Sequence, residues 1–394
     1  MHYLLIRNAR LPKPGGDDTE ASVLMANGRI ISIGAEAQHP LTNTTEIDAA
    51  GCYVLPSLIS LSNPRPANID GDSLSKMNFE NATAGITSII TVSPDVEDNI
   101  ADLQMATTPL LNYAIHLPLS QITLSESRRI HRLMIREGVA TAIMRIGDER
   151  HDNPTEMSAN ITAARIMGLR VLFDIRGLID RAERMRQLKS ICRILREDDK
   201  NMAYIIGIEY DDELSVVSEA SESCDLAAHL SFDPFAHNGS DGKISGQTAA
   251  RALRDNSWCS LGLAYSATKA IREHWPDMTP EIVSRNKLPL LNALCADPML
   301  SPAELAEFTV SRPAEFVGLR PPLGIVKEGA LANLIVWNHN FADDARFASP
   351  KGDIQDVPLR GRIDYVVMNG QIVVNDKFRP EAVCGRHLYG RIVK

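Results

Sequence analysis

Short runs of alternating hydrophobic and polar residues mark both ends of the chain. Near the N-terminus they are Tyr3–Leu11, Ser22–Ala35 and Thr45–Leu55, and near the C-terminus they are Ala330–Asn338 and Ile363–Asp376. This period of two predicts β-strands. An Asn-Gly pair, the sequence that a tight hairpin turn favours, interrupts a run at each end, at residues 27–28 and 369–370. The two ends therefore predict one composite β-sandwich domain, made of residues 1–55 and 319–394.

The middle of the chain, residues 56–318, alternates short apolar runs with amphipathic stretches. The apolar runs predict eight strands, at Leu58–Leu61, Ile86–Val92, Leu111–His116, Ala140–Arg145, Leu169–Asp174, Ala203–Ile208, Cys224–His229 and Cys259–Ala264. Between them, Ser125–Glu137, Pro154–Met167 and Ala182–Arg196 have the apolar spacing of helices. Eight strands that alternate with helices predict a (β/α)8 TIM barrel. Its active face would lie at the C-terminal ends of the strands.

Composition narrows the classes of function. The 394-residue chain has a formal net charge of −9, which argues against a nucleic-acid-binding surface. No apolar run approaches the roughly 18 residues of a membrane span, and the start of the chain does not resemble a signal peptide. The six cysteines are scattered without a CxxC pair. This pattern indicates isolated thiols in a reducing compartment, so we expect a cytoplasmic protein.

Several segments, taken in order, resemble the amidohydrolase superfamily and, within it, dihydroorotases. Gly51–Pro64 (GCYVLPSLISLSNP) resembles the superfamily's first barrel strand, which normally ends in His-x-His. Asn81–Pro94 and Glu137–Arg145 resemble the second strand and the strand that carries a metal-bridging lysine. LIVWN and VPLRGRIDYVVMNGQIVV resemble the closing sandwich strands. The resemblance covers nearly the whole chain and implies the same fold: a TIM barrel with a β-sandwich built from both termini.

The same resemblance implies that the first metal ligands are replaced. These enzymes hold one or two divalent metals, usually zinc, at the barrel mouth and use a metal-bound hydroxide to attack a cyclic amide. In this chain the two histidine positions of His-x-His are occupied by Ser62 and Pro64. A serine hydroxyl is a poor zinc ligand, and a proline side chain offers no donor. The bridging lysine falls on Met144, or on a neighbouring residue if the alignment shifts by one, and none of these is lysine.

The remaining catalytic positions are replaced as well. The fifth-strand histidine falls on Asp174, and the segment 207–210, where the next histidine is expected, has none. The general acid/base aspartate of the last strand falls on Ser266, which cannot take a proton near neutral pH without a partner base. We therefore expect no catalytic residues, no metal site and no cofactor.

Four residues are candidates for a residual pocket. In dihydroorotases an arginine and an asparagine hold the substrate carboxylate, and Arg65 lies one position early for the first role. Asp95 replaces the asparagine and would repel a carboxylate. His116 and His229 fall near strand ends and, with Asp174 and Asp95, are the residues from which a relocated metal site would have to be built. Single histidines at such places are commonly just hydrogen-bonded.

The segment Asp180–Glu197 is rich in basic residues. It carries Arg181, Arg184, Arg186, Lys189, Arg193 and Arg196. The simpler interpretation is a solvated outer helix of the barrel with charge pairs along it. The alternative is a face on which a partner docks.

The resemblance is greatest to the inactive dihydroorotase-like proteins that associate with aspartate transcarbamoylase in some bacteria. We therefore expect a non-catalytic structural or regulatory subunit of that enzyme in pyrimidine biosynthesis. The expected partners are the transcarbamoylase catalytic chain and a second copy of this chain within a larger complex, with no nucleic acid and no membrane. Two alternatives stay open: an active cyclic-amide hydrolase with a rebuilt or metal-independent site, and a dihydropyrimidinase-like scaffold outside pyrimidine synthesis.

Overall fold

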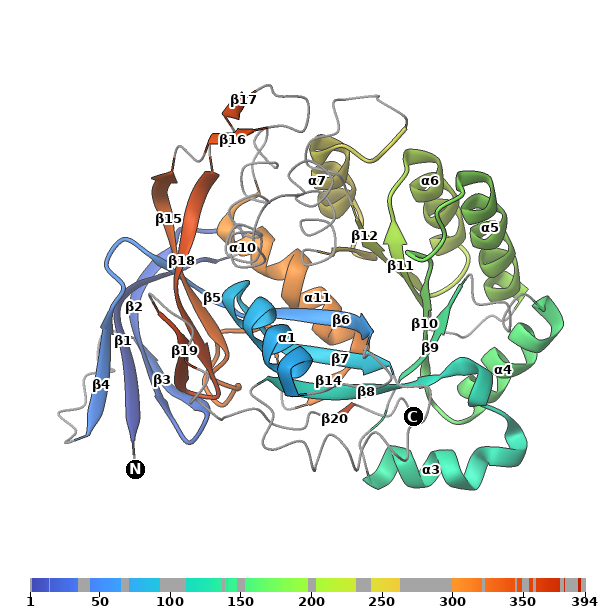
Figure 1. Ribbon diagram of the computed structural model, residues 1–394, viewed down its shortest axis with the longest axis horizontal. Coiled ribbons are helices and arrows are strands. Elements are labelled where there is room, and N and C mark those ends of the chain that lie inside the picture. Colours follow the sequence, from blue (N-terminus) through green and yellow to red (C-terminus); the bar gives the residue numbers. More distant parts are fainter. Residues whose placement is uncertain are drawn as a thin grey trace.

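The computed structural model describes most of the N-terminal and central chain and parts of the C-terminal region. The described residues are 2–13, 15–34, 43–64, 71–92, 111–136, 139, 141–146, 153–197, 203–231, 242–262, 300–320, 323–343, 346–348, 354–356, 359–375, 379 and 389–390. Three of the sequence-derived candidates, Arg65, Asp95 and Ser266, lie outside these residues. The helices and strands form two sheet-based units that lie side by side (Figure 1).

Strands from both ends of the chain interleave in one mostly antiparallel eight-stranded sheet, shown in blue and red in Figure 1. The order is β19-β18-β15-β5-β1-β2-β3, and β4 pairs with β1. The strands are β1 (Tyr3–Leu11), β2 (Thr19–Ala26), β3 (Arg29–Gly34), β4 (Thr44–Asp48), β5 (Tyr53–Pro56), β15 (Leu334–Asp343), β18 (Leu359–Met368) and β19 (Gln371–Val374). The junction of the two ends is the antiparallel pair β5–β15. The composite sheet predicted from the alternating patterns is confirmed.

Both Asn-Gly pairs form the hairpin turns that the sequence predicts. The φ angles are 52° and 76° at Asn27-Gly28, and 47° and 77° at Asn369-Gly370. Asparagine and glycine tolerate this left-handed region better than other residues. The two turns lie against each other, because Ala332 donates its N–H to the Gly28 carbonyl and accepts from the Gly370 N–H, each at 3.0 Å. These hydrogen bonds therefore link the hairpin turn near the N-terminus to the hairpin turn near the C-terminus.

The central strands of this sheet are buried on both faces. In β15, Leu334 and Val336 belong to the sheet's own core, whereas Ile335 and Trp337 belong to the core of the barrel. This follows from the period of two along a strand. A strand with apolar residues on both faces needs a covering layer on each side. The barrel is therefore packed directly on the composite sheet.

The second sheet has eight parallel strands in sequential order, β6 to β13. They are β6 (Leu58–Pro64), β7 (Ile86–Val92), β8 (Asn112–Pro118), β9 (Thr141–Arg145), β10 (Arg170–Asp174), β11 (Ala203–Ile208), β12 (Leu226–Leu230) and β13 (Cys259–Leu261). Each overlaps one of the eight predicted strands. The strand side chains that the structure describes are almost wholly buried, as expected for a parallel sheet that is covered on both faces. The π-helix η4 (Glu307–Ser311) contacts both edge strands, β6 and β13.

Helices connect and cover these strands. They are α1 (Gly71–Thr83), α3 (Ser127–Arg136), α4 (Pro154–Ile166), α5 (Arg181–Glu197), α6 (Asp211–Ser221), α7 (Gly246–Asp255), α10 (Pro302–Ala306) and α11 (Arg312–Val317). Short 3-10 turns lie at Leu119–Gln121 and Leu124–Glu126, and the small pairs β14 (Leu319–Arg320) with β20 (Tyr389–Gly390) and β16 (Arg346–Ala348) with β17 (Ile354–Asp356) complete the elements. The three predicted amphipathic helices are confirmed as α3, α4 and α5.

Local sequence explains where several helices start. Asn153 caps α4 by accepting the Thr155 N–H at 3.1 Å, and Pro154 follows as the first helical residue. Ser245 caps α7 by accepting the Thr248 N–H at 3.1 Å. In the part of the chain that the structure describes, no helix is long and apolar enough to cross a membrane.

Candidate functional site

Five polar side chains come together toward the C-terminal ends of the barrel strands, and we call them the mouth cluster: His116, Arg145, Asp174, Arg176 and His229. The strand register explains the arrangement. Asp174 pairs with Arg145 on one side and with Ile206 on the other, and Ile206 pairs with His229. Paired residues of parallel strands point to the same face, so Arg145, Asp174 and His229 share one face of the sheet. Three of the five were sequence candidates.

His116, from β8, is fully buried and uses both ring nitrogens. Its Nε2 lies 2.7 Å from the Leu61 carbonyl and its Nδ1 lies 2.5 Å from the Thr141 hydroxyl. Because a carbonyl can only accept, Nε2 donates and Nδ1 accepts from Thr141. Burial, with a smaller contribution from Arg145, lowers the pKa of His116 to about 4. The imidazole is neutral at pH 7, and neither nitrogen is available to a metal in this arrangement.

His229, from β12, is buried and hydrogen-bonded through Nδ1. This atom lies 2.8 Å from the Ser260 hydroxyl and 3.0 Å from the Tyr204 hydroxyl, and these two hydroxyls also bond to each other. The pKa of His229 is lowered to about 3, mainly by burial and in addition by the positive charge of Arg176. A side chain at Gly262 would collide with the imidazole, since a Cβ there would lie 2.9 Å from Nε2.

Asp174 ends β10 and is bound by Arg176 two residues later. The Arg176 Nη2 lies 2.6 Å from Oδ2 and its Nε lies 2.8 Å from Oδ1, while the Arg176 N–H approaches Oδ1 at 3.2 Å. This is the two-pronged geometry in which a guanidinium binds a carboxylate most strongly. Both oxygens of Asp174 are therefore engaged by a cation of the chain itself.

The segment where the sixth-strand histidine is expected has a local irregularity. Gly207 has a φ of 100°, and the register between β11 and β12 shifts between Ile206 and Ile208. A Cβ on Gly207 would lie 2.4 Å from the Arg176 Cγ, which is closer than Cβ contacts normally come. Any side chain here, histidine included, would require Arg176 to move. Glycine at this position and arginine at 176 thus fit each other.

The other candidate positions can be placed as follows. Met144 is buried and pairs with Phe173, whereas its neighbour Arg145 pairs with Asp174. Arg145, rather than Met144, therefore shares a face with Asp174. The backbone of Ser62 and Pro64 forms the end of β6, where Pro64 pairs with Val92. Among the residues that the structure describes, no three His, Cys, Asp or Glu side chains are grouped so that they could hold a metal. The described residues of the mouth therefore do not fit a zinc centre.

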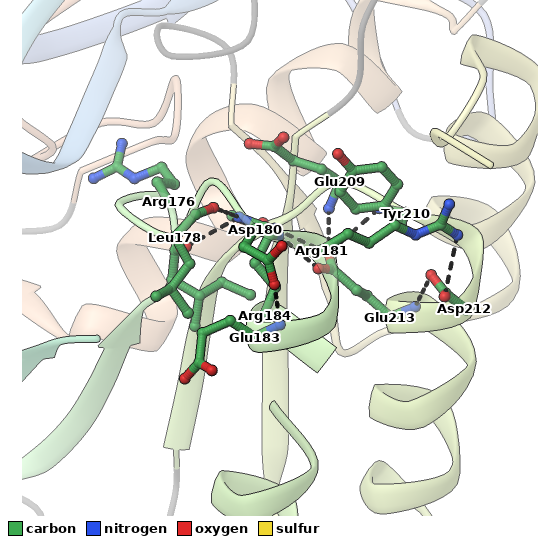
Figure 2. A network of polar contacts seen from close by, with 12 residues as sticks. Arg176, Leu178, Asp180, Arg181, Glu183, Arg184, Glu209, Tyr210, Asp212 and Glu213 are labelled. Carbon is green, nitrogen blue, oxygen red and sulfur yellow. Dashed lines mark hydrogen bonds and ion pairs between the residues drawn. The ribbon is translucent and has the colours of Figure 1, made fainter. Parts of the chain in front are cut away.

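A buried ion pair fixes the loops that follow β10 and β11 (Figure 2). Arg184, on α5, binds Glu213, on α6, with Nε–Oε1 and Nη2–Oε2 distances of 2.8 and 3.0 Å. Arg184 also donates to the carbonyls of Ile175, Leu178 and Gly207, at 3.0, 3.2 and 2.7 Å. Glu213 in turn accepts the N–H of Glu209 at 2.9 Å. We call this the α5–α6 clamp. It holds the backbone next to Arg176 and Gly207.

The clamp changes the interpretation of the basic segment. Arg181, Arg186 and Arg196 form ion pairs with Asp212, Glu183 and Glu219, as the outer-helix interpretation predicts. Arg184 differs, because its side chain is only 2% exposed and it is not solvated. Lys189 and Arg193 are exposed on α5. The docking interpretation of this helix stays a prediction.

A cavity of about 650 Å³ lies at the other end of the barrel. It is lined by the first residues of three strands, Arg170, Leu226 and Cys259, and by Tyr204 and Phe316, whose rings stack with centroids 4.0 Å apart. Tyr204 therefore links this cavity to His229. Burial raises the pKa of the Cys259 thiol to about 12, so this thiol is no nucleophile near neutral pH.

Sequence reasoning missed Arg176 and the α5–α6 clamp. A signal for Arg176 was present, since it follows the candidate Asp174 by two residues. Nothing in the sequence singled out Glu213 among the three consecutive acidic residues 211–213. Its role depends on α6 packing against α5.

Comparisons with known proteins agree with this fold. Residues 214–373 match the family model of the amidohydrolase family. The fold is shared with a D-hydantoinase (TM-score 0.78, 16% identity, 100% of both chains covered). It is also shared with the dihydropyrimidinase of Brevibacillus agri (0.76, 15% identity, 100% of this chain and 99% of the other) and the L-hydantoinase of Arthrobacter aurescens (0.72, 16%, 99% and 100%). No curated protein matches the chain by sequence.

The predicted fold is confirmed by these likenesses: the chain has the TIM barrel and accessory β-sandwich of hydantoinases. At about 15% identity the likeness concerns the fold and not the activity. Together, the family match and the fold support the amidohydrolase superfamily. The narrower dihydroorotase-like assignment stays a prediction.

Proposed function

We propose that the chain is a catalytically inactive, dihydroorotase-like subunit that supports aspartate transcarbamoylase. The observation that carries the first half of this proposal is the Asp174–Arg176 pair. A hydrolase of this type needs convergent metal ligands at the barrel mouth. Here the aspartate binds the Arg176 guanidinium at 2.6 and 2.8 Å. The Cγ of the same arginine lies against Gly207, in the segment of the next expected histidine.

The two histidines support the same reading. A relocated metal site would need at least three converging ligands. His116 has both nitrogens in hydrogen bonds, and His229 uses Nδ1 for Tyr204 and Ser260. Recruiting these ligands would break several buried hydrogen bonds, each of which is unfavourable to lose. Both histidines of the mouth are therefore hydrogen-bonded within the protein core.

The partner is inferred from the family resemblance of the sequence. The exposed basic positions Lys189 and Arg193 on α5 offer one face for docking on a chain whose formal net charge is −9. Electrostatic complementarity of this kind favours orientation and rate of association. A chain that supports the assembly of its partner does not need a catalytic site in its barrel.

The test combines metal analysis with a binding experiment. The purified chain is analysed for zinc and assayed for hydrolysis of dihydroorotate and hydantoin. It is then mixed with aspartate transcarbamoylase from the same organism and run on a sizing column. We expect less than stoichiometric zinc, no turnover, and a co-eluting complex whose transcarbamoylase activity exceeds that of the enzyme alone. The double variant Lys189→Glu/Arg193→Glu tests the α5 face, with Arg251→Glu on α7 as the control.

Stoichiometric zinc with turnover of a cyclic amide would overturn the proposal in favour of an active hydrolase. The second candidate, a dihydropyrimidinase-like scaffold outside pyrimidine synthesis, is favoured by the likeness to hydantoinases and a dihydropyrimidinase over the whole chain. It predicts the absence of both turnover and a transcarbamoylase complex.

A further inference from the structure

The mouth cluster contains more positive than negative charge. The ionisable groups that act on Arg145 are Asp174, which favours its charged form, and Arg176, which disfavours it. Burial lowers the pKa of Arg145 most, but a guanidinium remains charged in proteins. With both histidines neutral at pH 7, the five residues of the mouth cluster carry two guanidinium charges and one carboxylate charge.

The carboxylate is already taken by one of the two cations. Arg176 binds both oxygens of Asp174. Arg145 forms no ion pair with any residue that the structure describes, although it ends β9 beside Asp174 in the register. Arg145 therefore has only the attraction of a carboxylate that Arg176 already binds, and the like charge of Arg176 makes its half-buried charge less favourable.

We propose that the barrel mouth binds a small oxyanion, a carboxylate or a phosphate group, at the guanidinium of Arg145. The planar fork of arginine matches the two oxygens of such a group. Arg145 is partly exposed and the Arg176 side chain retains 15% exposure, so the site can be reached from solvent. The negative charge of the anion would balance the positive charge of Arg145, because Asp174 is already bound by Arg176. This proposal concerns the isolated chain and is independent of the proposed transcarbamoylase partner.

The surroundings restrict the ligand to a small anion that binds without chemistry. His116 is held by Thr141 and Leu61, so it neither adds charge nor donates a proton to the ligand. Asp174 repels a second negative group on the side of Arg176. A ligand with one oxyanion group near Arg145, and a neutral remainder, fits the cluster best.

The experiment measures binding of two probes to the full chain by isothermal titration calorimetry at pH 7 in a low-salt buffer free of chloride. The probes are acetate and inorganic phosphate, and the tighter one identifies the carboxylate or the phosphate arm. We expect one site per chain. Arg145→Gln should weaken binding about tenfold to a hundredfold, as for loss of a charge-assisted pair, and Arg145→Lys should weaken it less. Arg251→Gln, which replaces an exposed arginine on α7, is the matched control and should bind like the wild type.

A second variant should change the affinity for the anion in the opposite direction. Asp174→Asn removes the negative charge and frees Arg176, so it should bind either probe roughly tenfold more tightly. If this variant is unstable, the same probes should raise its Tm more than that of the wild type. The proposal is overturned if neither probe binds the wild type, or if Arg145→Gln binds as well as Arg251→Gln.

Discussion

Two of the barrel's arginine–carboxylate pairs lie close together and differ in their burial, in the elements that supply them and in their surroundings. In the α5–α6 clamp, Arg184 and Glu213 are 2% and 1% exposed and come from different helices. In the mouth cluster, Arg176 and Asp174 are 15% and 6% exposed and lie two residues apart. In the first pair, Arg184 also donates hydrogen bonds to three backbone carbonyls, and Glu213 accepts one from a backbone N–H. The second has an additional cation, Arg145, beside it.

The difference separates a structural role from a binding role. A buried ion pair is tolerated when every donor and acceptor is satisfied, and it then fixes the elements that supply the two charges. The clamp meets this condition and holds the backbone at Gly207. The mouth pair is partly exposed, and among the described residues Arg145 beside it forms no ion pair, so the proposed anion would balance its charge. Neighbouring pairs of the same chemistry thus serve the fold and the site.

Removing the clamp should produce the largest effect on stability. Glu213→Ala leaves the buried Arg184 charge without its partner, and we expect a loss of about 3–5 kcal/mol in the free energy of unfolding. The measurement is urea unfolding followed by circular dichroism at pH 7. Glu219→Ala is the matched control, because it removes an exposed carboxylate on the same helix that pairs with Arg196, and it should change stability by less than about 1 kcal/mol. Equal losses in the two variants would contradict the structural role of the clamp.

The neutral histidines of the mouth should make stability depend on pH. Their pKa values are lowered from the ordinary 6.5 to about 4 in His116 and about 3 in His229. Between these values and 6.5 the unfolded chain binds more protons, so stability rises with pH. The stabilisation is complete above pH 6.5 and is lost as the pH falls toward 4 and 3. Each histidine contributes on the order of 3 kcal/mol.

Urea unfolding at pH 7.5, 5.5 and 4.5 checks this expectation. His116→Gln retains a donor for the Leu61 carbonyl but cannot be protonated, so it should reduce the loss of stability between pH 7.5 and 4.5. A wild-type stability that does not change over this range would contradict the neutral, buried state of both rings.

A smaller effect should follow from filling the space at Gly207. Gly207→Ala places a Cβ 2.4 Å from the Arg176 Cγ, in addition to the strain of a positive φ. Gly51→Ala is the control, because Gly51 has a φ of 75° with no atom within 4 Å of the added Cβ. We expect Gly207→Ala to be less stable than Gly51→Ala by about 1–3 kcal/mol, the usual range for overpacking. Similar stabilities would mean that Arg176 moves freely, and would weaken the proposed fit at the mouth.

Much of the fold could be read from local patterns. The alternating runs at both ends and the two Asn-Gly turns predicted the composite sheet, and the eight apolar runs predicted β6–β13 to within a few residues. The family resemblance indicated the candidate site residues at the barrel mouth. Three of them, His116, Asp174 and His229, lie in one cluster. Ser266, Arg65 and Asp95 lie outside the described residues and stay predictions.

The sequence by itself determined the strands, the turns and the residue types available at the barrel mouth, because each depends on neighbours within a few positions. Only the tertiary structure decided which charges meet. Glu213 becomes the partner of Arg184 when α6 packs on α5, and Gly207 accommodates Arg176 when β10 and β11 pair in register. The physical reason is that an ion pair or a steric fit depends on distances of a few ångströms between segments far apart in the chain. Local propensity carries no information about those distances.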